Sequence, residues 1–248
     1  MSSIRVKTPG MCPAVALDII KNHLRVSVDN DDALIAIYAM AAEEWVEGYT
    51  GLSFIKKTYE QRHDWFPLYD SRQNTFVESA GRNPSYYQGL WFVDSMKIKT
   101  LVSPIIPGTT TIDYIGVDGT PQTQLTTSTP DFQEDPYSRP SRLLPLSGNW
   151  WPWVEFNKAN SLTITFDASV ADETAIQAAI AGSPPVDEAT ARQAAVPGWA
   201  QAAILLLAAH WYEHREEVSE LSTLKQIPMG VQTLLGMFAI NDFCPTKG

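Results

Sequence analysis

The stretch Trp199-Ala-Gln-Ala-Ala-Ile-Leu-Leu-Leu-Ala-Ala-His-Trp-Tyr-Glu-His-Arg-Glu-Glu217 runs without a polar residue from Ala202 to Ala209. Pro197 and Gly198 precede it, and helices commonly start just after a proline. Two helical turns without a polar stripe predict a helix over residues 199–218 that is buried on more than one side. The remaining segments must therefore supply apolar surfaces that pack around this helix.

A membrane-spanning helix is the alternative for this stretch. Spanning a bilayer requires about 20 predominantly apolar residues. Here ionisable side chains, among them His210, Glu213 and Glu217, follow the apolar run at once. We therefore predict a core helix and no membrane partner.

The composition indicates a folded, acidic protein. The chain has 248 residues, of which 44% are hydrophobic, and a formal net charge of −10. This hydrophobic share is enough for a sizeable core. Lys and Arg are scattered singly except for Lys56-Lys57, so no basic stripe is available to bind DNA phosphates tightly.

The cysteine pattern and the N-terminal residues indicate in which cellular compartment the protein is made. Cys12 and Cys244 are far apart in sequence and form no CxxC motif, which favours free thiols in a reducing compartment over a disulfide or zinc site. The first residues lack the basic and apolar regions of a signal peptide, so we expect synthesis in the cytosol.

Three further segments show helical periodicity, over residues 15–25, 31–50 and 228–240. In the second, Asp31 or Asp32 is the expected N-cap and Thr50-Gly51 the expected end. Its predicted buried stripe is Leu34, Ile37, Tyr38, Ala41, Trp45 and Tyr49. The complete predicted core consists of Leu17, Leu24, Leu34, Tyr38, Trp45, Ile204, Leu205, Leu207 and Trp211.

The middle of the chain, residues 54–168, shows the alternation of apolar and polar residues that is typical of short strands. Strands are predicted from residue 54 onward and over 96–102, 111–117, 122–127 and 162–166, with a hairpin turn at Asp118-Gly119. Residues 69–89 show no period and are predicted to form a long loop.

The Ala-rich residues 169–196 follow, with two short helices expected to start at Asp172 and Asp187, outside the core. We therefore predict one α+β domain over residues 1–248. A helical core formed by 15–51 and 197–240 carries a small antiparallel β insertion and ends in a tail, 241–248.

His210 and His214 are four residues apart, which places both imidazoles on one helix face, as in two-ligand metal sites. Trp211 stands where a metalloprotease motif requires Glu, so we predict packing and hydrogen bonding for this pair, and no metal or cofactor. Catalytic and nucleotide-binding motifs are absent from the sequence. Glu43 and Glu47, also four apart, are expected on a solvated helix face unless a basic group opposes them.

Two apolar groups are candidate interfaces. Trp150, Trp151 and Trp153 surround Pro152 and predict a hydrophobic plug that closes the β unit onto the helices or a contact with another subunit, with ligand stacking as the alternative. Near the C-terminus, an apolar stripe predicts a contact with another subunit or a partner protein, while packing back onto the first helix remains the alternative. This stripe consists of Val231, Leu234, Leu235 and Phe238, and Phe243 extends it.

Several motifs resemble one known family. They are Leu17-Asp-Ile-Ile-Lys-Asn-His-Leu-Arg-Val26, Ala41-Ala-Glu-Glu-Trp-Val-Glu-Gly-Tyr-Thr-Gly51, Ile112-Asp-Tyr-Ile-Gly-Val-Asp-Gly119, Ala203-Ile-Leu-Leu-Leu-Ala-Ala-His-Trp-Tyr-Glu-His-Arg215 and Ile227-Pro-Met-Gly-Val231. In order and spacing they resemble the head-tail connector (adaptor) proteins of tailed bacteriophages. Residues 69–89 and 171–195 look like insertions relative to that family.

The resemblance implies a structural virion protein made in the host cytoplasm and located in the neck. Its copies would form a ring, usually a dodecamer, between the portal protein and a stopper or tail-completion protein. Packaged DNA would pass through the channel without specific binding, and the negative charge of the chain agrees with this. A small hydrolase or metal-dependent enzyme and a DNA-packaging accessory protein remain the alternatives.

Overall fold

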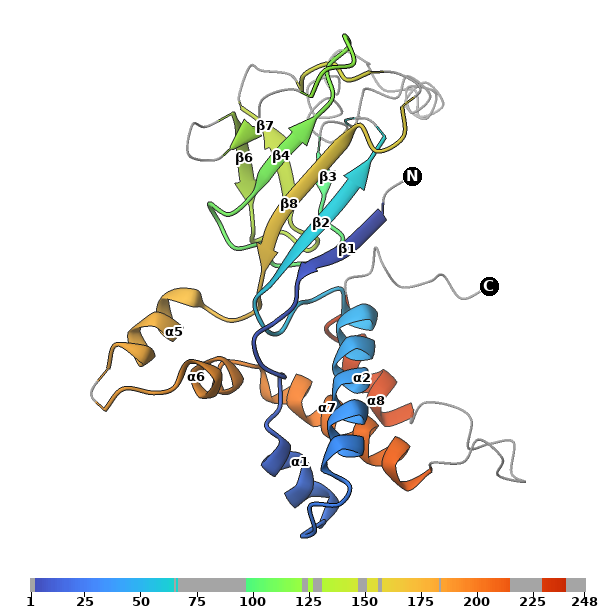
Figure 1. Cartoon of the computed structure of the whole chain (residues 1–248), viewed down its shortest axis with the longest axis vertical. Coiled ribbons are helices and arrows are strands. Elements are labelled where there is room, and N and C mark those ends of the chain that lie inside the picture. Colours follow the sequence, from blue (N-terminus) through green and yellow to red (C-terminus); the bar gives the residue numbers. More distant parts are fainter. Residues whose placement is uncertain are drawn as a thin grey trace, which may run out of the picture. The chain divides into compact units, whose positions relative to one another are not determined.

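The computed structural model describes residues 3–64, 66, 97–121, 125–126, 131–146, 151–155, 158–182, 184–214 and 229–239. The chain forms two compact units (Figure 1). The helical unit comprises Pro9–Lys57 and Ala168–Gly248, and the β unit comprises Met1–Thr8 and Thr58–Asp167. Helices and small antiparallel sheets within the described residues confirm the predicted α+β class.

The helical unit is built around α7, the helix of the apolar run. Its helices are α1 (Leu17–Leu24), α2 (Asp32–Thr50), α5 (Glu173–Ile180), α6 (Glu188–Ala194), α7 (Gly198–Glu213) and α8 (Met229–Gly236). Helix α7 packs against α1, α2 and α8, and it buries Ile204 and Leu207 in the centre of the core. Residues 215–218, 228 and 240 of the predicted helices lie outside the described residues.

No single helix within the described ranges is long and apolar enough to cross a membrane. The pair α6 and α7 passes that test of length and composition only when taken together, and it is bent by 96°.

The predicted core residues fall into three groups. Ile204 and Leu207 are buried, while Leu34 and Tyr38 are half-exposed and lie outside the core cluster. The remaining five are partly buried and pack against the core: Leu17, Leu24, Trp45, Leu205 and Trp211.

The buried face of α2 is displaced by about one residue from the predicted stripe. The core contains Ile35, Ala39 and Val46, whereas Ile37 and Ala41 are exposed. Residues 33–42 are apolar on every side of the helix, so periodicity alone cannot select the face that packs inward. The small Ala39 and Ala42 let α2 approach α7 closely, and the bulkier Tyr38 is turned partly outward.

The caps of α2 agree only in part with the prediction. Gly51 ends the helix in the left-handed conformation, with φ of 71°. Asp31 occupies the N-cap position, but its side chain does not cap the helix. Instead its carboxylate accepts a hydrogen bond from the Tyr212 hydroxyl at 2.6 Å, which joins the start of α2 to the end of α7.

The two short helices start where the sequence predicts. Asp172 accepts a hydrogen bond from the Thr174 N–H at 2.9 Å, and Asp187 accepts one from the Ala189 N–H at 3.1 Å. These side chains satisfy backbone donors that a helix start otherwise leaves unpaired. The segment does not lie wholly outside the core, because Val196 at its end belongs to the core cluster and Val170 packs against it. Ile176 is buried on α5, which packs against α6.

The β unit contains two sheets. The first has strand order β1 (Ser3–Thr8), β2 (Lys57–His63), β8 (Leu162–Ala168), β4 (Thr111–Tyr114) and β5 (Leu125–Thr126). The second has order β3 (Ile98–Lys99), β7 (Arg142–Pro145) and β6 (Phe132–Asp135). Strand β8 buries alternate residues, among them Leu162, Ile164 and Phe166, as its sequence predicts.

The sequence located β2, β3, β4, β5 and β8 but not the others. Strand β1 is exposed along most of its length and pairs antiparallel with β2, so it has little apolar alternation to identify it. Strands β6 and β7 are four residues each and lie in a region rich in Pro, Ser and Asp. The predicted loop 69–89 lies outside the described residues.

Candidate functional site

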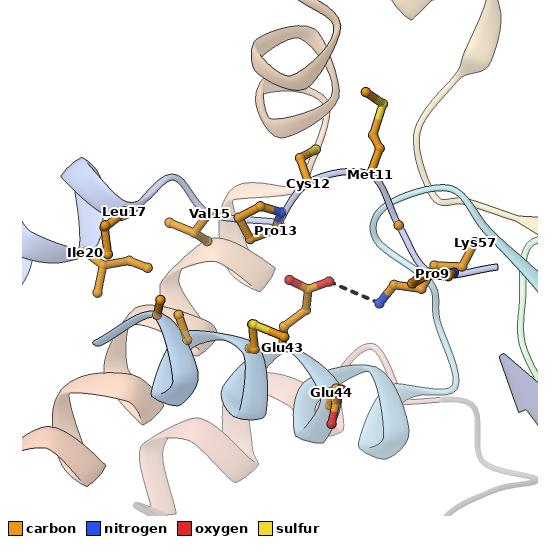
Figure 2. Close-up of a pocket in the computed structure, with 14 residues that line it drawn as sticks. Pro9, Met11, Cys12, Pro13, Val15, Leu17, Ile20, Glu43, Glu44 and Lys57 are labelled. Carbon is orange, nitrogen blue, oxygen red and sulfur yellow. Dashed lines mark hydrogen bonds and ion pairs between the residues drawn. The ribbon is translucent and has the colours of Figure 1, made fainter. Parts of the chain in front are cut away.

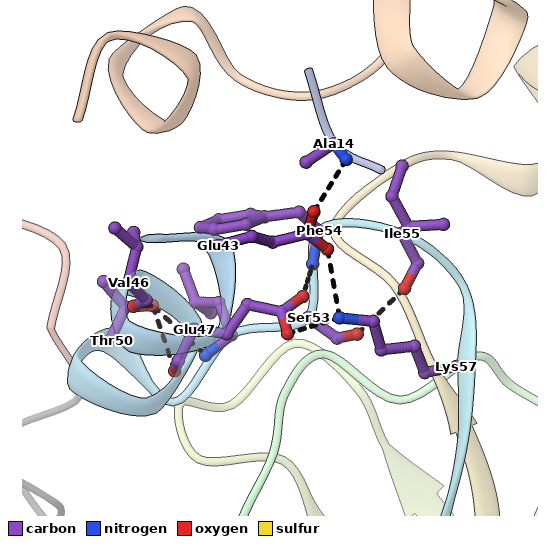
Figure 3. A network of polar contacts seen from close by, with 10 residues as sticks. Ala14, Glu43, Val46, Glu47, Thr50, Ser53, Phe54, Ile55 and Lys57 are labelled. Carbon is purple, nitrogen blue, oxygen red and sulfur yellow. Dashed lines mark hydrogen bonds and ion pairs between the residues drawn. The ribbon is translucent and has the colours of Figure 1, made fainter. Parts of the chain in front are cut away.

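A buried ionic cluster ties the end of α2 to the two chain segments beside it (Figure 3). The Lys57 ammonium lies 3.1 Å from a Glu43 carboxylate oxygen and 2.6 Å from a Glu47 carboxylate oxygen. The other Glu43 oxygen accepts the Ala14 N–H at 2.8 Å, and Glu47 accepts the Phe54 N–H at 2.9 Å. One cation and two carboxylates therefore hold residue 14, α2 and residues 54–57 together.

The cluster corrects the expectation that Glu43 and Glu47 lie on a solvated face. Both side chains are largely buried, and Lys57 is the basic group that opposes them. Burial raises the pKa of Glu47, against the attraction of Lys57. Their spacing on α2 reflects a shared partner ten to fourteen residues away, which no local sequence rule identifies.

Beside the cluster lies a pocket of about 440 Å³ (Figure 2). Its floor is α2, its opposite wall is the segment that leads into α1, and Glu43 reaches across it to Lys57. The lining is mostly apolar and includes Met11, Cys12 and Met40. Burial raises the pKa of the Cys12 thiol, which is consistent with a packing role for this free cysteine. Sequence reasoning did not find this pocket, because its lining combines residues 9–20, residues 36–44 and Lys57, which meet only after folding.

The two tryptophans described in residues 150–153 differ in burial. Trp151 is buried in the β unit and stacks on Phe66, with ring centroids 5.0 Å apart. Trp153 is 65% exposed. Trp151 thus belongs to the interior of the β unit, Trp153 is exposed, and Trp150 lies outside the described residues.

The C-terminal stripe packs inward, which corrects its assignment as an outward interface. Val231 and Leu235 are buried in the helical core, and Leu234 packs against it. Phe238 stacks on Trp199, with centroids 4.1 Å apart. Helices α7 and α2 supply the apolar partners that the sequence did not place beside this helix. Phe243 lies outside the described residues.

His210 and His214 are close together at the end of α7. Their ring centroids are 4.8 Å apart, and the Nδ1 of His214 lies 3.0 Å from the His210 carbonyl oxygen. Burial lowers the pKa of His210, and the neighbouring His214 lowers it further. Within the part of the chain that the structure describes, no group of three or more His, Cys, Asp or Glu side chains is arranged to hold a metal ion.

Comparisons with known proteins point to one group. Residues 15–76 match the family model described as Phage gp6-like head-tail connector protein. No curated protein matches the sequence. The matched stretch contains α1, α2 and the three charged side chains of the ionic cluster, Glu43, Glu47 and Lys57. It supplies only part of the pocket lining, because residues 9–13 of that lining precede it.

Similar solved structures cover nearly the whole chain. A chain in "Virion of native gene transfer agent (GTA) particle" has 18% identity and a TM-score of 0.62, over 95% of this chain and 94% of that one. A chain in "Neck of empty GTA particle computed with C6 symmetry" has 16% identity and a TM-score of 0.62, over 96% and 95%. One in "Neck of native GTA particle computed with C12 symmetry" has 17% identity and a TM-score of 0.58, over 96% and 94%.

At these identities the likeness establishes the fold. The chain therefore has the fold of proteins found in gene transfer agent particles and carries, in residues 15–76, the match to the phage head-tail connector family, which confirms the resemblance drawn from its sequence.

Proposed function

We propose that this chain is a structural head-tail connector, whose copies form a ring in the neck of a tailed particle. The observation that carries the proposal is the match of residues 15–76 to the connector family, because this stretch builds α1, α2 and the ionic cluster. The fold shared with chains of gene transfer agent necks, over nearly the full length, supports the same role.

A ring of copies is the expected assembly. The similar neck structures were computed with C6 and C12 symmetry, which supports a cyclic arrangement for this chain as well. Within such a neck, the portal protein is the expected partner on the head side, and a stopper or tail-completion protein is the expected partner on the other side. A structural role also agrees with a non-enzymatic family.

The charge of the chain suits a DNA channel. A net charge of −10 per copy is multiplied around a ring and repels the phosphates of passing DNA. Without a basic stripe, the ring would let DNA pass without holding it.

Negative-stain imaging of the full chain, alone and mixed with portal rings, tests this function. We expect rings with a central channel or portal rings with an added layer, and the portal alone is the control. A chain that stays monomeric and leaves the portal unchanged would contradict the connector role.

A second experiment concerns the C-terminus. Because Val231 and Leu235 belong to the core, only a deletion that starts beyond α8 leaves the fold intact. We expect a chain without residues 241–248 to melt like the full chain but to bind portal rings more weakly in a pull-down. Equal binding by both chains would place the portal contact elsewhere.

A further inference from the structure

The pocket on the helical unit has an exposed apolar rim. Met11, in the segment before α1, is 60% exposed, and Met40, on α2, is 56% exposed. Ile37, one turn before Met40 on α2, is exposed as well. Methionines around an apolar hollow are typical of protein-binding surfaces, since flexible, polarisable side chains adapt to a partner.

The same pocket carries an exposed negative charge. Glu44 lines it from α2, next to Glu43. Glu43 is paired with Lys57, whereas Glu44 is exposed and forms no ion pair among the residues that the structure describes. A partner that fits this pocket therefore needs an apolar surface with a cation beside it.

The corner between α1 and α2, residues 24–29, has an exposed apolar side chain with a cation beside it. Arg25 is exposed in the left-handed conformation, with φ of 58°, and Val28 is exposed beside it. Within the described ranges, Arg25 forms no ion pair. The other charges at the corner are already paired, because Lys21 lies 2.6 Å from Asp29 and 2.7 Å from Asp32.

The pocket and the corner are different patches of one helical unit. Glu44 follows the start of α2 by 12 residues, which corresponds to about 18 Å along the helix axis. The corner precedes the start of α2, whereas Glu44 lies in the second half of that helix, so Arg25 and Glu44 belong to separate patches of one copy. A closed ring requires two different, complementary patches on each subunit, and these two meet that requirement.

We infer that the pocket of one copy receives the α1–α2 corner of the next copy, with Arg25 paired to Glu44 and Val28 against Met11 and Met40. This inference rests on the proposed ring and identifies the occupant of the pocket as a second copy of this chain. Opposite charges at an interface fix its register and suppress wrong arrangements.

A charge swap tests the contact in the full chain. We expect Glu44→Arg and, separately, Arg25→Glu to lower the fraction of chain in rings about tenfold, as measured by mass photometry and imaging with portal. The double variant Glu44→Arg/Arg25→Glu should recover ring formation to within about twofold of the wild type. Glu213→Arg, the same charge change at the exposed end of α7, is the matched control and should form rings normally.

The outcomes separate this contact from the function itself. Rings formed normally by both single variants, or not recovered by the double variant while both singles fail, would overturn the contact and leave the connector role standing. A wild-type chain that forms no ring with or without portal would overturn both.

Discussion

Lys57 joins the members of the buried ionic cluster in the helical unit. It is the cation between two largely buried carboxylates, whose remaining oxygens accept backbone N–H groups from the segments on either side. A buried charge is tolerated only when it is paired and hydrogen-bonded, and each member of this cluster relies on the others.

Replacing Lys57 by Met should therefore destabilise the chain by about 3–5 kcal/mol, because it leaves two carboxylates buried without a cation. Urea unfolding measures this loss. The control is Lys158→Met, which removes a more exposed ion pair with Glu155 and should cost less than about 1 kcal/mol. Equal losses of stability in both variants would contradict a larger contribution from the buried Lys57 cluster than from the more exposed Lys158–Glu155 ion pair.

Glu47 should make stability depend on pH. Its pKa is raised by burial above 4.5, so the folded chain binds this proton more tightly than the unfolded chain. As pH falls from neutrality through the raised pKa toward 4.5, the wild type should gain stability relative to Glu47→Gln, and the difference should level off below that. Urea unfolding at a series of pH values measures it, and a difference that does not vary with pH would contradict the burial of an ionised Glu47.

At the scale of elements, two glycines of α2 should respond in opposite ways to alanine. Gly48 lies within the helix with no atom in the way of a Cβ, so Gly48→Ala should stabilise the chain by about 0.5–1 kcal/mol. Gly51 has a φ of 71°, and Gly51→Ala should destabilise it by about 1 kcal/mol. Thermal melts compare the two, and a loss at Gly48 would mean that α2 is packed on its outer face within one copy.

Two neighbouring leucines of α7 differ in burial and can be compared directly. Leu207→Ala should cost about 2–5 kcal/mol, because Leu207 is fully buried between α7 and its partner helices. Leu206, which is 46% exposed, is the control, and Leu206→Ala should cost less than about 1 kcal/mol. If denaturant unfolding gave similar losses for both, α7 would not be the centre of the core.

The elements differ in how far the sequence predicts them, for physical reasons. Elements that depend on local chemistry are located by the sequence: helix α7, the caps Asp172 and Asp187, and the Asp118-Gly119 turn between β4 and β5. The inward face of α2, the edge strand β1 and the burial of α8 depend on distant partners, which periodicity does not name. The same holds for the candidate site, because Lys57 and Glu43 meet only after folding.

At the scale of the whole molecule, we propose that copies of this chain form the joint between the head and the tail of a particle. The family match of residues 15–76 supports this proposal, and the pocket and the α1–α2 corner give the copies a way to bind one another.

Immunogold labelling of intact particles with an antibody against this chain locates the chain directly. We expect gold at the head-tail junction of wild-type particles, and no gold there on particles made without the chain. Gold over the capsid shell or along the tail, or no gold on particles at all, would contradict the assignment.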